Sequence, residues 1–375
     1  MQFSCVSSDL AKGVNIVKRA ISSSNNAPIF SGVHMVLAGN ELNLVGMDVN
    51  FTMNLVLQVN GAADGEILVP AKAIGELLAR FDGDDTLTLS QGENEKELTI
   101  EAVKARGQYH IPLMDPAEYP ALPTIGQEHV LTLSEEVIGS LIRSTVYACS
   151  TDDSRPLYTG VLLEKRGTEL TAVGTNTHRL AIKTTVLENG DDSEFSMLIP
   201  ARVLKEIGAN LNGDLPEDVV LCQERRQILA KVGDLKIISS LIEGNFPDFR
   251  KPIPPSFNNR TVFNRTDLEK AIQRVALFSQ SDYNIVRLSL EADHMVLSSA
   301  VSDMGQGQEI VACTTTGSSL PLNIAFNSRY FTDFFKNCGT DQICLETNTS
   351  LSPALLTPAG DESYKYIVTP VRVIF

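Results

Sequence analysis

Apolar residues recur at helical spacing in six segments of the chain. The segments occur in pairs, and the same pair is found in three successive stretches of sequence. The first segment, 10–21, follows the polar pair Ser8 and Asp9, either of which is predicted to cap it. The matching helices in the next two stretches are predicted after Ser134 and after Thr266. Second helices are predicted over 71–80, 201–210 and 328–337. The pattern therefore predicts two helices per stretch, three times over.

Alternating apolar and polar positions between these helices predict antiparallel strands. They cover 33–37, 41–46, 54–59, 160–164, 169–174, 180–184, 286–290 and 294–299, and shorter strands are predicted at 86–89, 219–222 and 342–345. Each stretch thus predicts an α+β unit, whose two helices must lie on one face of its sheet to bury their apolar stripes.

Matching sequence supports this threefold division. Tyr119-Pro120 is matched by Phe246-Pro247, and Pro70-Ala71 before the second helix is matched by Pro200-Ala201. A third version of that helix start is Asn327-Ser328. We expect three domains at 1–125, 126–253 and 254–375, each of an ordinary domain's size. Repeated domains usually build an extended surface or a ring, so geometry rather than catalysis is the first expectation.

The charge of the chain is unevenly distributed. A net charge of −15 argues against a general nucleic-acid coat, yet the six helix windows hold more basic than acidic residues. Lys and Arg are good helix formers on solvated faces, which explains the bias without any partner. A basic face shared by six matching helices is the alternative. The basic residues are Lys12, Lys18, Arg19, Lys72, Arg80, Arg143, Arg202, Lys205, Lys270, Arg274, Arg329 and Lys336.

One cluster suggests hydrolytic chemistry. His178 beside Arg179, with Asp152, Asp153 and Ser154 upstream, contains the residue types of a catalytic triad. A triad also needs its nucleophile on a constrained turn, and the chain has no GxSxG or equivalent element. The sequence therefore favours a protein that is not an enzyme.

Other motifs point to neither metals, cofactors nor membranes. The six cysteines form no CxxC pair and the five histidines no HExxH motif, so we expect buried free thiols, no metal and no cofactor. No run approaches the roughly 20 apolar residues of a membrane span, and the start lacks the plan of a secretory signal. A cytoplasmic location is expected. Gly305-Gln306-Gly307 is predicted to be a hairpin turn rather than a phosphate loop.

Three segments together resemble a known family. They are 175–181 (Thr-Asn-Thr-His-Arg-Leu-Ala), 244–250 (Gly-Asn-Phe-Pro-Asp-Phe-Arg) and the tail 366–372 (Tyr-Ile-Val-Thr-Pro-Val-Arg). With the threefold layout, the whole chain is similar to the β subunit of bacterial DNA polymerase III, the sliding clamp. The resemblance implies a head-to-tail homodimer whose six domains close a ring around duplex DNA. It also implies a non-catalytic processivity factor for replication, with helices lining the hole.

The resemblance assigns residues to the contact between subunits and to the contact with DNA. Tyr109 and Ile111 are expected to meet Leu277 and Phe278 of the neighbouring subunit. In the loop after the first helix of the second domain, Arg155 is the better DNA contact, because Pro156-Leu157 stands where some clamps carry aromatics. The candidates for sequence-independent DNA contact are Lys12, Lys72, Arg80, Arg143, Arg155, Arg202, Lys205, Lys270, Arg274 and Arg329.

The family also has a pocket that takes short peptides from the replicative polymerase, the clamp loader, repair polymerases and mismatch-repair proteins. Carried over by position, it maps to Tyr158, Thr175, Thr177, His178, Arg179, Leu180, Pro247, Lys251, Pro252, Tyr283, Asn327, Tyr330, Leu351, Ile367, Val368, Thr369, Pro370, Val371 and Arg372. Besides Pro156-Leu157, this chain departs from the family in two further places, with Thr177 where Gly is usual and with the extra tail residues Ile374 and Phe375. The rival hypothesis is a scaffold of the same repeats that binds peptides but not DNA.

Overall fold

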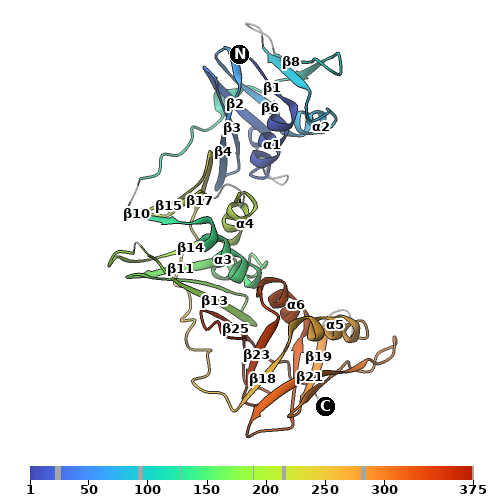
Figure 1. Ribbon diagram of the computed structural model, residues 1–375. Helices are drawn as coiled ribbons and strands as arrows, with labels where there is room; N and C mark the ends of the chain where they lie inside the picture. The colour runs from blue at the N-terminus through green and yellow to red at the C-terminus, as the bar shows by residue number, and fades with distance from the viewer. Residues whose placement is uncertain are drawn as a thin grey trace. The chain divides into compact units, whose positions relative to one another are not determined.

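The computed structural model describes residues 1–21, 27–91, 96–126, 128–188, 190–212, 217–279 and 284–373. By its internal contacts the chain divides into two compact units (Figure 1). The first unit consists of Met1–Glu135 and Ala209–Leu241, and the second consists of Glu136–Gly208 and Ile242–Phe375.

Six α-helices occur in the described part of the chain, and each one directly follows a strand. They are α1 (Ser7–Lys18), α2 (Ala71–Leu78), α3 (Glu135–Thr145), α4 (Ala201–Ala209), α5 (Arg265–Ala276) and α6 (Ser328–Asn337). The preceding strands are β1 (Gln2–Val6), β6 (Gly65–Pro70), β10 (His129–Leu133), β14 (Glu194–Pro200), β18 (Asn259–Asn264) and β22 (Leu322–Asn327). This recurrence confirms the α+β fold with two helices in each of three repeats. The expected limits of the three domains stay a prediction.

The first unit holds two antiparallel sheets. One has the order β5-β1-β7-β8-β9 and the other the order β10-β15-β16-β17-β4-β3-β2-β6. The strands not yet given are β2 (Gly32–Ala38), β3 (Glu41–Met47), β4 (Phe51–Gln58), β5 (Asn60–Ala63), β7 (Thr86–Ser90), β8 (Glu97–Ala102), β9 (Gly107–Pro112), β15 (Val219–Glu224), β16 (Gln227–Val232) and β17 (Leu235–Ser240). In the second sheet β17 pairs with β4, Leu235 lying opposite Leu55, so one sheet joins the first and central repeats.

The second unit is built on one antiparallel sheet, of order β14-β11-β12-β13-β25-β24-β23-β18-β21-β20-β19-β22. Its remaining strands are β11 (Gly160–Arg166), β12 (Glu169–Thr175), β13 (Arg179–Val186), β19 (Ile285–Leu290), β20 (His294–Ser298), β21 (Gln308–Gly317), β23 (Gln342–Thr347), β24 (Ala354–Pro358) and β25 (Tyr364–Val368). Here β13 of the central repeat pairs with β25 of the last repeat. The predicted turn at Gly305 is confirmed, since it connects the paired strands β20 and β21.

The two compact units do not coincide with the three repeats, because strand pairing crosses both repeat boundaries. The strands β10, β15, β16 and β17 of the central repeat belong to the first unit, whereas β11 to β14 belong to the second. Backbone hydrogen bonds along β17–β4 and β13–β25 tie each half of the central repeat to its neighbour.

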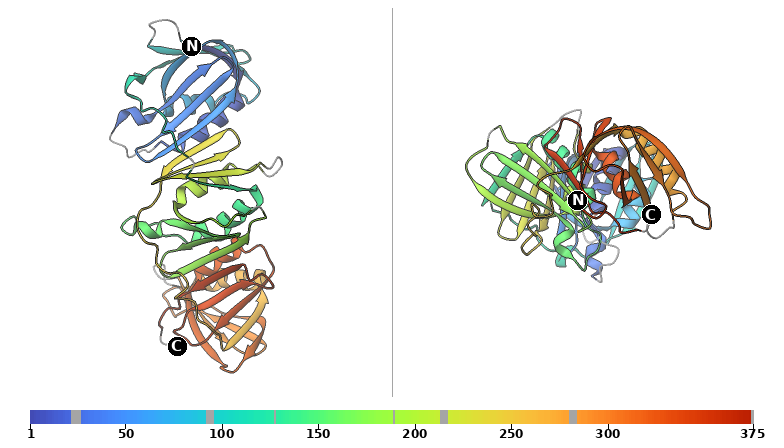
Figure 2. Two further views of the ribbon diagram at one scale, coloured as in Figure 1. Left: turned by 90° about the vertical axis from the view of Figure 1, so that its left-hand side faces the viewer. Right: turned by 90° about the horizontal axis from the view of Figure 1, so that it is seen from below.

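The helix pairs of the first and last repeats pack against the sheet of their own repeat. In the first repeat α1 packs on α2 and on β3 and β4, and in the last repeat α5 packs on α6 and on β21 (Figure 2). The last repeat has the most aromatic core, in which Phe331, Phe334 and Phe335 of α6 are fully buried. Phe334 stacks on Tyr366 of β25 with ring centroids 5.1 Å apart.

The predicted capping of α1 is wrong. The helix begins at Ser7, and no side chain caps it. Instead, the first free amides donate to carbonyls of a neighbouring turn: Ser7 N to Asp85 O at 2.8 Å and Ser8 N to Gly83 O at 3.0 Å. A tertiary contact thus satisfies the exposed N–H groups that a side-chain cap would otherwise satisfy. For α5 the cap is Asn264, whose Oδ1 accepts from Thr266 N and Asp267 N.

Two repeats bring a helix end against a glycine of the sheet. A Cβ on Gly46 in β3 would lie 2.1 Å from the Val17 carbonyl oxygen at the end of α1. A Cβ on Gly174 in β12 would lie 2.3 Å from the Thr145 carbonyl oxygen at the end of α3. Only a residue without a side chain permits this backbone approach, so the same requirement recurs in the first two repeats.

Gly46→Ala should destabilise the protein by about 2–3 kcal/mol, because the added methyl meets a backbone carbonyl that cannot move without shifting α1. Gly83→Ala is the matched control in the same repeat: its Cβ would meet only Ser8 Cβ, at the ordinary distance of 3.7 Å. Denaturant unfolding of the two variants checks this, and equal midpoints would contradict the close-approach argument.

Candidate functional site

A cavity of about 230 Å³ lies in the second unit, between the beginning of β13, the end of β25 and the segment 246–252. Leu180, Phe249 and Ile367 in its wall belong to one buried apolar cluster. The lining residues are Tyr158, Thr175, Thr177, Arg179, Leu180, Phe246, Pro247, Asp248, Phe249, Pro252, Pro353, Ile367 and Thr369. An apolar hollow with a few polar groups at its margin is suited to anchoring an extended peptide.

Strand pairing determines which residues of β25 reach the cavity. Leu180 of β13 lies opposite Ile367 of β25, and both line the hollow. Successive side chains of a strand point to opposite faces, so Tyr366 and Val368 point the other way and are wholly buried in the core of the last repeat. The predicted pocket residue Val368 therefore supports the site from behind rather than lining it.

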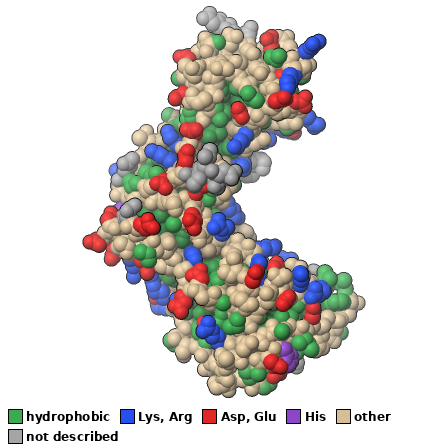
Figure 3. Space-filling view, viewed as in Figure 1, with side chains coloured by type: hydrophobic (Ala, Val, Ile, Leu, Met, Phe, Trp, Pro, Cys, Tyr) green, Lys and Arg blue, Asp and Glu red, His purple; other side chains and the backbone are tan. Residues whose placement is uncertain are grey.

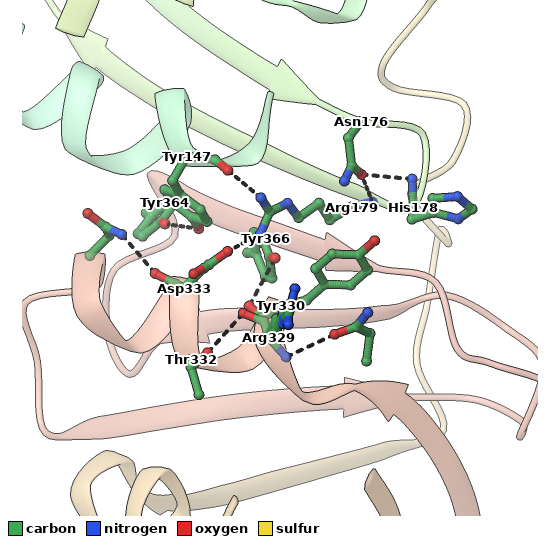
Figure 4. Close-up of polar contacts among 12 residues, drawn as sticks. Tyr147, Asn176, His178, Arg179, Arg329, Tyr330, Thr332, Asp333, Tyr364 and Tyr366 are labelled. Carbon is green, nitrogen blue, oxygen red and sulfur yellow. Dashed lines mark hydrogen bonds and ion pairs between the residues drawn. The ribbon is translucent and has the colours of Figure 1, made fainter. Parts of the chain in front are cut away.

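The loop 175–179 is held by its own polar side chains. Thr175 Oγ1 donates to Arg179 O at 2.6 Å and accepts from Thr177 N at 3.1 Å. Asn176 Oδ1 accepts from His178 N and Arg179 N, both at 3.0 Å (Figure 4). These four bonds fix the backbone where it enters β13.

Thr177 has a strained backbone conformation within this loop, with φ +78°. A β-branched residue with positive φ is an outlier that persists only where surrounding structure holds it, and such strain concentrates at functional sites. Glycine, the usual residue of the family at this position, adopts this φ freely, whereas threonine does so only with strain. The exposed Thr177 side chain stands at the cavity wall.

Arg179 is the buried charge of the site, with its side chain 9% exposed. Its guanidinium donates to Asp333 of α6 at 2.5 Å and to the Tyr147 carbonyl oxygen beyond α3 (Figure 4). It also lies over the rings of Tyr147 and Tyr330, 5.5 and 4.9 Å from their centroids. The Arg179 side chain thereby connects Tyr147 of the central repeat with Asp333 on helix α6 of the last repeat.

The surroundings keep this arginine charged. Burial acts to lower the pKa of Arg179, but Tyr366 and Asp333 outweigh burial and the net shift is upward. Tyrosines complete the network: Tyr147 and Tyr364 share a hydroxyl hydrogen bond of 2.6 Å, and the Tyr366 hydroxyl donates to Tyr330 O at 3.0 Å. Burial raises the pKa of Tyr364, so its hydroxyl stays protonated at neutral pH.

Nine of the predicted pocket residues line the cavity: Tyr158, Thr175, Thr177, Arg179, Leu180, Pro247, Pro252, Ile367 and Thr369. Leu351, which was predicted to line the pocket, is 60% exposed and is not part of the lining. Pro353, two residues later, lines the cavity instead. The cavity also includes Phe246, Asp248 and Phe249, which sequence reasoning missed although their Phe-Pro-Asp-Phe-Arg motif carried the resemblance.

The other described candidates for the pocket are not part of the cavity lining. Asn327 caps α6, and Tyr330 packs on Arg179. The tail is attached through Val371 N, which donates to Ala325 O at 2.7 Å. His178, Lys251 and Arg372 are exposed, and Pro370 and Val371 are half-buried. Tyr283 and the tail residues Ile374 and Phe375 lie outside the described residues.

All ten predicted DNA contacts are exposed. Eight lie on helices; Arg80 follows α2, and Arg155 precedes the short 3-10 helix Pro156–Tyr158. Arg274 donates to both carboxylate oxygens of Glu309, so a phosphate must compete with that carboxylate. On the viewed face, basic side chains are interspersed with acidic ones (Figure 3).

The predicted subunit contacts differ in accessibility. Strand β9, which holds Tyr109 and Ile111, is an edge strand with one free side for hydrogen bonding. Tyr109 is half-buried against Phe81, whereas Ile111 is only 6% exposed. Leu277 is 67% exposed and Phe278 half-buried. Leu277 and the free edge of β9 are therefore the better candidates for contact.

The structure gives no support to hydrolytic chemistry. The His178 ring has no hydrogen-bond partner among the described residues, and Asp152 accepts from the Ser154 amide within a turn. Within the described ranges no group of acidic, histidine and cysteine side chains could hold a metal, and no helix is long and apolar enough to cross a membrane. All six cysteines are free thiols; burial raises the pKa of Cys149 to about 12.

Comparison with known proteins covers nearly the whole chain. Models of the DNA polymerase III β subunit match as its N-terminal domain at 1–123, its central domain at 132–248 and its C-terminal domain at 250–372. The β sliding clamp of Synechococcus elongatus is 29% identical over 380 residues, with 100% of both chains covered. That of Staphylococcus aureus is 28% identical over 369 residues and covers 96% of each.

Solved structures give the same result. The DNA polymerase sliding clamp from Bacillus subtilis superposes with a TM-score of 0.92 at 26% identity, covering 100% of both chains. The sliding clamp from Pseudomonas aeruginosa, at 24% identity, has the same fold with a TM-score of 0.92 over 100% of both chains. Matches to all three domain models, in order and end to end, show that this chain belongs to the DNA polymerase III β subunit family, the sliding clamps.

Proposed function

We propose that the protein is a DNA polymerase processivity factor, a non-catalytic accessory subunit that encircles duplex DNA and tethers other proteins to it. The observation that carries this proposal is the end-to-end match of all three repeats to the domains of the clamp family. Six helices with exposed Lys or Arg at or beside each of them supply contacts suited to phosphates. A protein with this role works in the cytoplasm.

The charge pattern suits sliding. A clamp must hold duplex DNA without stopping at any sequence, so it should contact phosphates through flexible cations and avoid base edges. A net charge of −15 repels DNA from the rest of the surface, while the helix cations attract it weakly. Closure of a ring then provides retention, and no single contact needs to be strong.

Closure requires a second copy. The edge strand β9 in the first repeat and the exposed Leu277 in the last are different surfaces, so a contact between them is heterologous. Such contacts either close or grow into filaments. Two copies of a three-repeat chain should close head to tail into a six-domain ring.

The cavity beside Arg179 is the proposed docking site for short peptides of the replicative polymerase, the clamp loader, repair polymerases and mismatch-repair proteins. Its apolar wall of Leu180, Phe249 and Ile367 suits an apolar peptide end, and the backbone around Thr369 offers hydrogen bonds. A peptide-binding scaffold that does not bind DNA would explain this cavity equally well, whereas exposed cations on all six helices favour contact with DNA.

Leu277→Glu should give a monomer, because a charge would replace the most exposed apolar side chain of the proposed contact. Light scattering at micromolar concentration measures the mass. Val186→Glu is the control, since Val186 is 71% exposed and belongs to β13, which is not part of the proposed contact. A wild-type protein that is itself monomeric would refute the ring.

Wild-type protein loaded by clamp loader and ATP should stay on nicked circular DNA through gel filtration and leave once the DNA is linearised. Replacing Lys72, Arg202 and Arg329 by Glu should impair loading or retention, because repulsion replaces phosphate contacts in all three repeats. The matched control replaces the strand lysines Lys231, Lys236 and Lys365 by Glu. Equal retention on short linear DNA would indicate ordinary site binding instead.

A hexapeptide with a Gln, a central Leu and a terminal Phe should bind with micromolar affinity, roughly −8 kcal/mol. Ending the chain after Thr369 should abolish binding, because it removes the backbone that the Gln is proposed to bind and the hydrogen bond from Val371 to Ala325. The dimer should stay intact, because the removed residues are not among the proposed subunit contacts. Leu180→Ala should weaken binding about tenfold by removing an apolar wall.

Calorimetry measures these affinities. Deleting only Ile374 and Phe375 is the control: tighter binding would mean that these residues obstruct the groove, and weaker binding that they extend it. A Thr369 truncation that binds peptide as well as wild type would place the pocket elsewhere.

A further inference from the structure

A second hollow adjoins the apolar cavity in the same unit. Its volume is about 390 Å³, and its lining shares four consecutive residues with the cavity, Phe246, Pro247, Asp248 and Phe249. The remaining lining residues are Leu162, Glu164, Arg166 and Arg250. Because the segment 246–249 borders both hollows, an extended chain anchored in the cavity can continue into the second one.

Strand β11 builds the floor of this hollow. Leu162, Glu164 and Arg166 are alternate residues of the strand and therefore face the same side of the sheet. The other alternate residues, Val161, Leu163 and Lys165, are buried on the opposite side. This face of the strand is apolar at Leu162 and charged at Glu164 and Arg166.

Two arginines share one carboxylate at the charged end. Arg250 donates to Glu164 Oε2 at 2.6 Å, and Arg166 donates to Glu164 Oε1 at 3.0 Å. The side chains of Arg166 and Arg250 are 57% and 47% exposed, whereas that of Glu164 is only 16% exposed. Arg250 also lies over the Phe249 ring, 4.1 Å from its centroid, which holds the guanidinium in position.

This arrangement leaves guanidinium N–H donors exposed beside the hollow. Each guanidinium has five N–H donors, and Glu164 satisfies only part of this capacity. The other lining acid, Asp248, accepts from Arg250 N at 3.2 Å and lies 4.0 Å from Lys251, so a further cation balances it. The lining thus pairs two arginines with two acids, and the guanidinium N–H groups that remain exposed can bind a further carboxylate.

We propose that the second hollow is an acid-reading subsite, which binds Asp or Glu residues flanking the apolar motif of a partner peptide. The inference rests on the proposed peptide-docking function of the cavity. Continuity through 246–249 favours an extension of the same peptide over an unrelated ligand, and arginine pairs bind carboxylates with well-defined geometry. Partners with acidic flanks would thus compete better for the clamp than partners with neutral flanks.

The test compares hexapeptides that carry the apolar motif with three Asp or three Ser residues added at either end. On the wild-type protein, Asp extension at one end should tighten binding about three- to tenfold over Ser extension, as two exposed ion pairs allow. The advantage should shrink in 0.5 M salt, because exposed charges are screened. The end that responds identifies the direction in which the peptide lies.

Arg166→Ala with Arg250→Ala should remove the Asp advantage and leave the affinity for Ser-extended peptide unchanged. The matched control, Lys231→Ala with Lys236→Ala, removes the same charge from strands β16 and β17 and should keep the advantage. Arg166→Glu alone, which leaves the Arg250–Phe249 contact in place, should reverse the preference toward a Lys-extended peptide.

Equal affinity of Asp- and Ser-extended peptides for the wild type would overturn the subsite while leaving the apolar pocket in place. Loss of the Asp advantage in the lysine control would also overturn it, because a general field would then explain the preference. Tight binding of single-stranded DNA that depends on Arg166 would assign the hollow to phosphates instead. Failure of every motif peptide to bind would refute the pocket itself and the subsite with it.

Discussion

Antiparallel strand pairing across the repeat boundaries is the constraint on which the rest of the structure depends. The β17–β4 and β13–β25 ladders make sheets continuous from one repeat to the next. Because the side chains of a strand alternate between faces, the β13–β25 register also determines that Leu180 and Ile367 line the cavity while Tyr366 and Val368 fill the core. A slip by one residue would exchange the two sets.

Electrostatics strengthens the same junction. A buried guanidinium is tolerated only when it is paired and hydrogen-bonded, and Arg179 meets both conditions through Asp333 and the Tyr147 carbonyl. Its partners come from β13's own repeat and from α6, so this ion pair forms only when the two repeats are docked. Arg179 borders the cavity as well, so the proposed docking site lies at this junction. A peptide bound there would meet a preformed wall.

The hollows beside the segment 246–252 differ in chemistry because they face different parts of one sheet. The first is bordered by the apolar ends of β13 and β25, and the second by the charged end of β11. A partner that occupied both would gain apolar contact from one and charge complementarity from the other. Such division suits a protein that serves several partners, since apolar contact supplies affinity and charge discriminates among competitors.

Much of this protein could be predicted from its sequence because the informative patterns are local and repeated. Helical periodicity located all six helices, alternation located eleven of the 25 described strands, and the motifs at 175–181 and 244–250 contain eight of the residues that line the cavity. Tertiary structure alone decided features that depend on distant partners. The α1 cap comes from carbonyls of Gly83 and Asp85, Pro353 replaces Leu351 in the wall, and Arg274 is paired with Glu309. Periodicity fixes which face of an element is buried, but what that face meets depends on chain far away in sequence, and no local pattern encodes it.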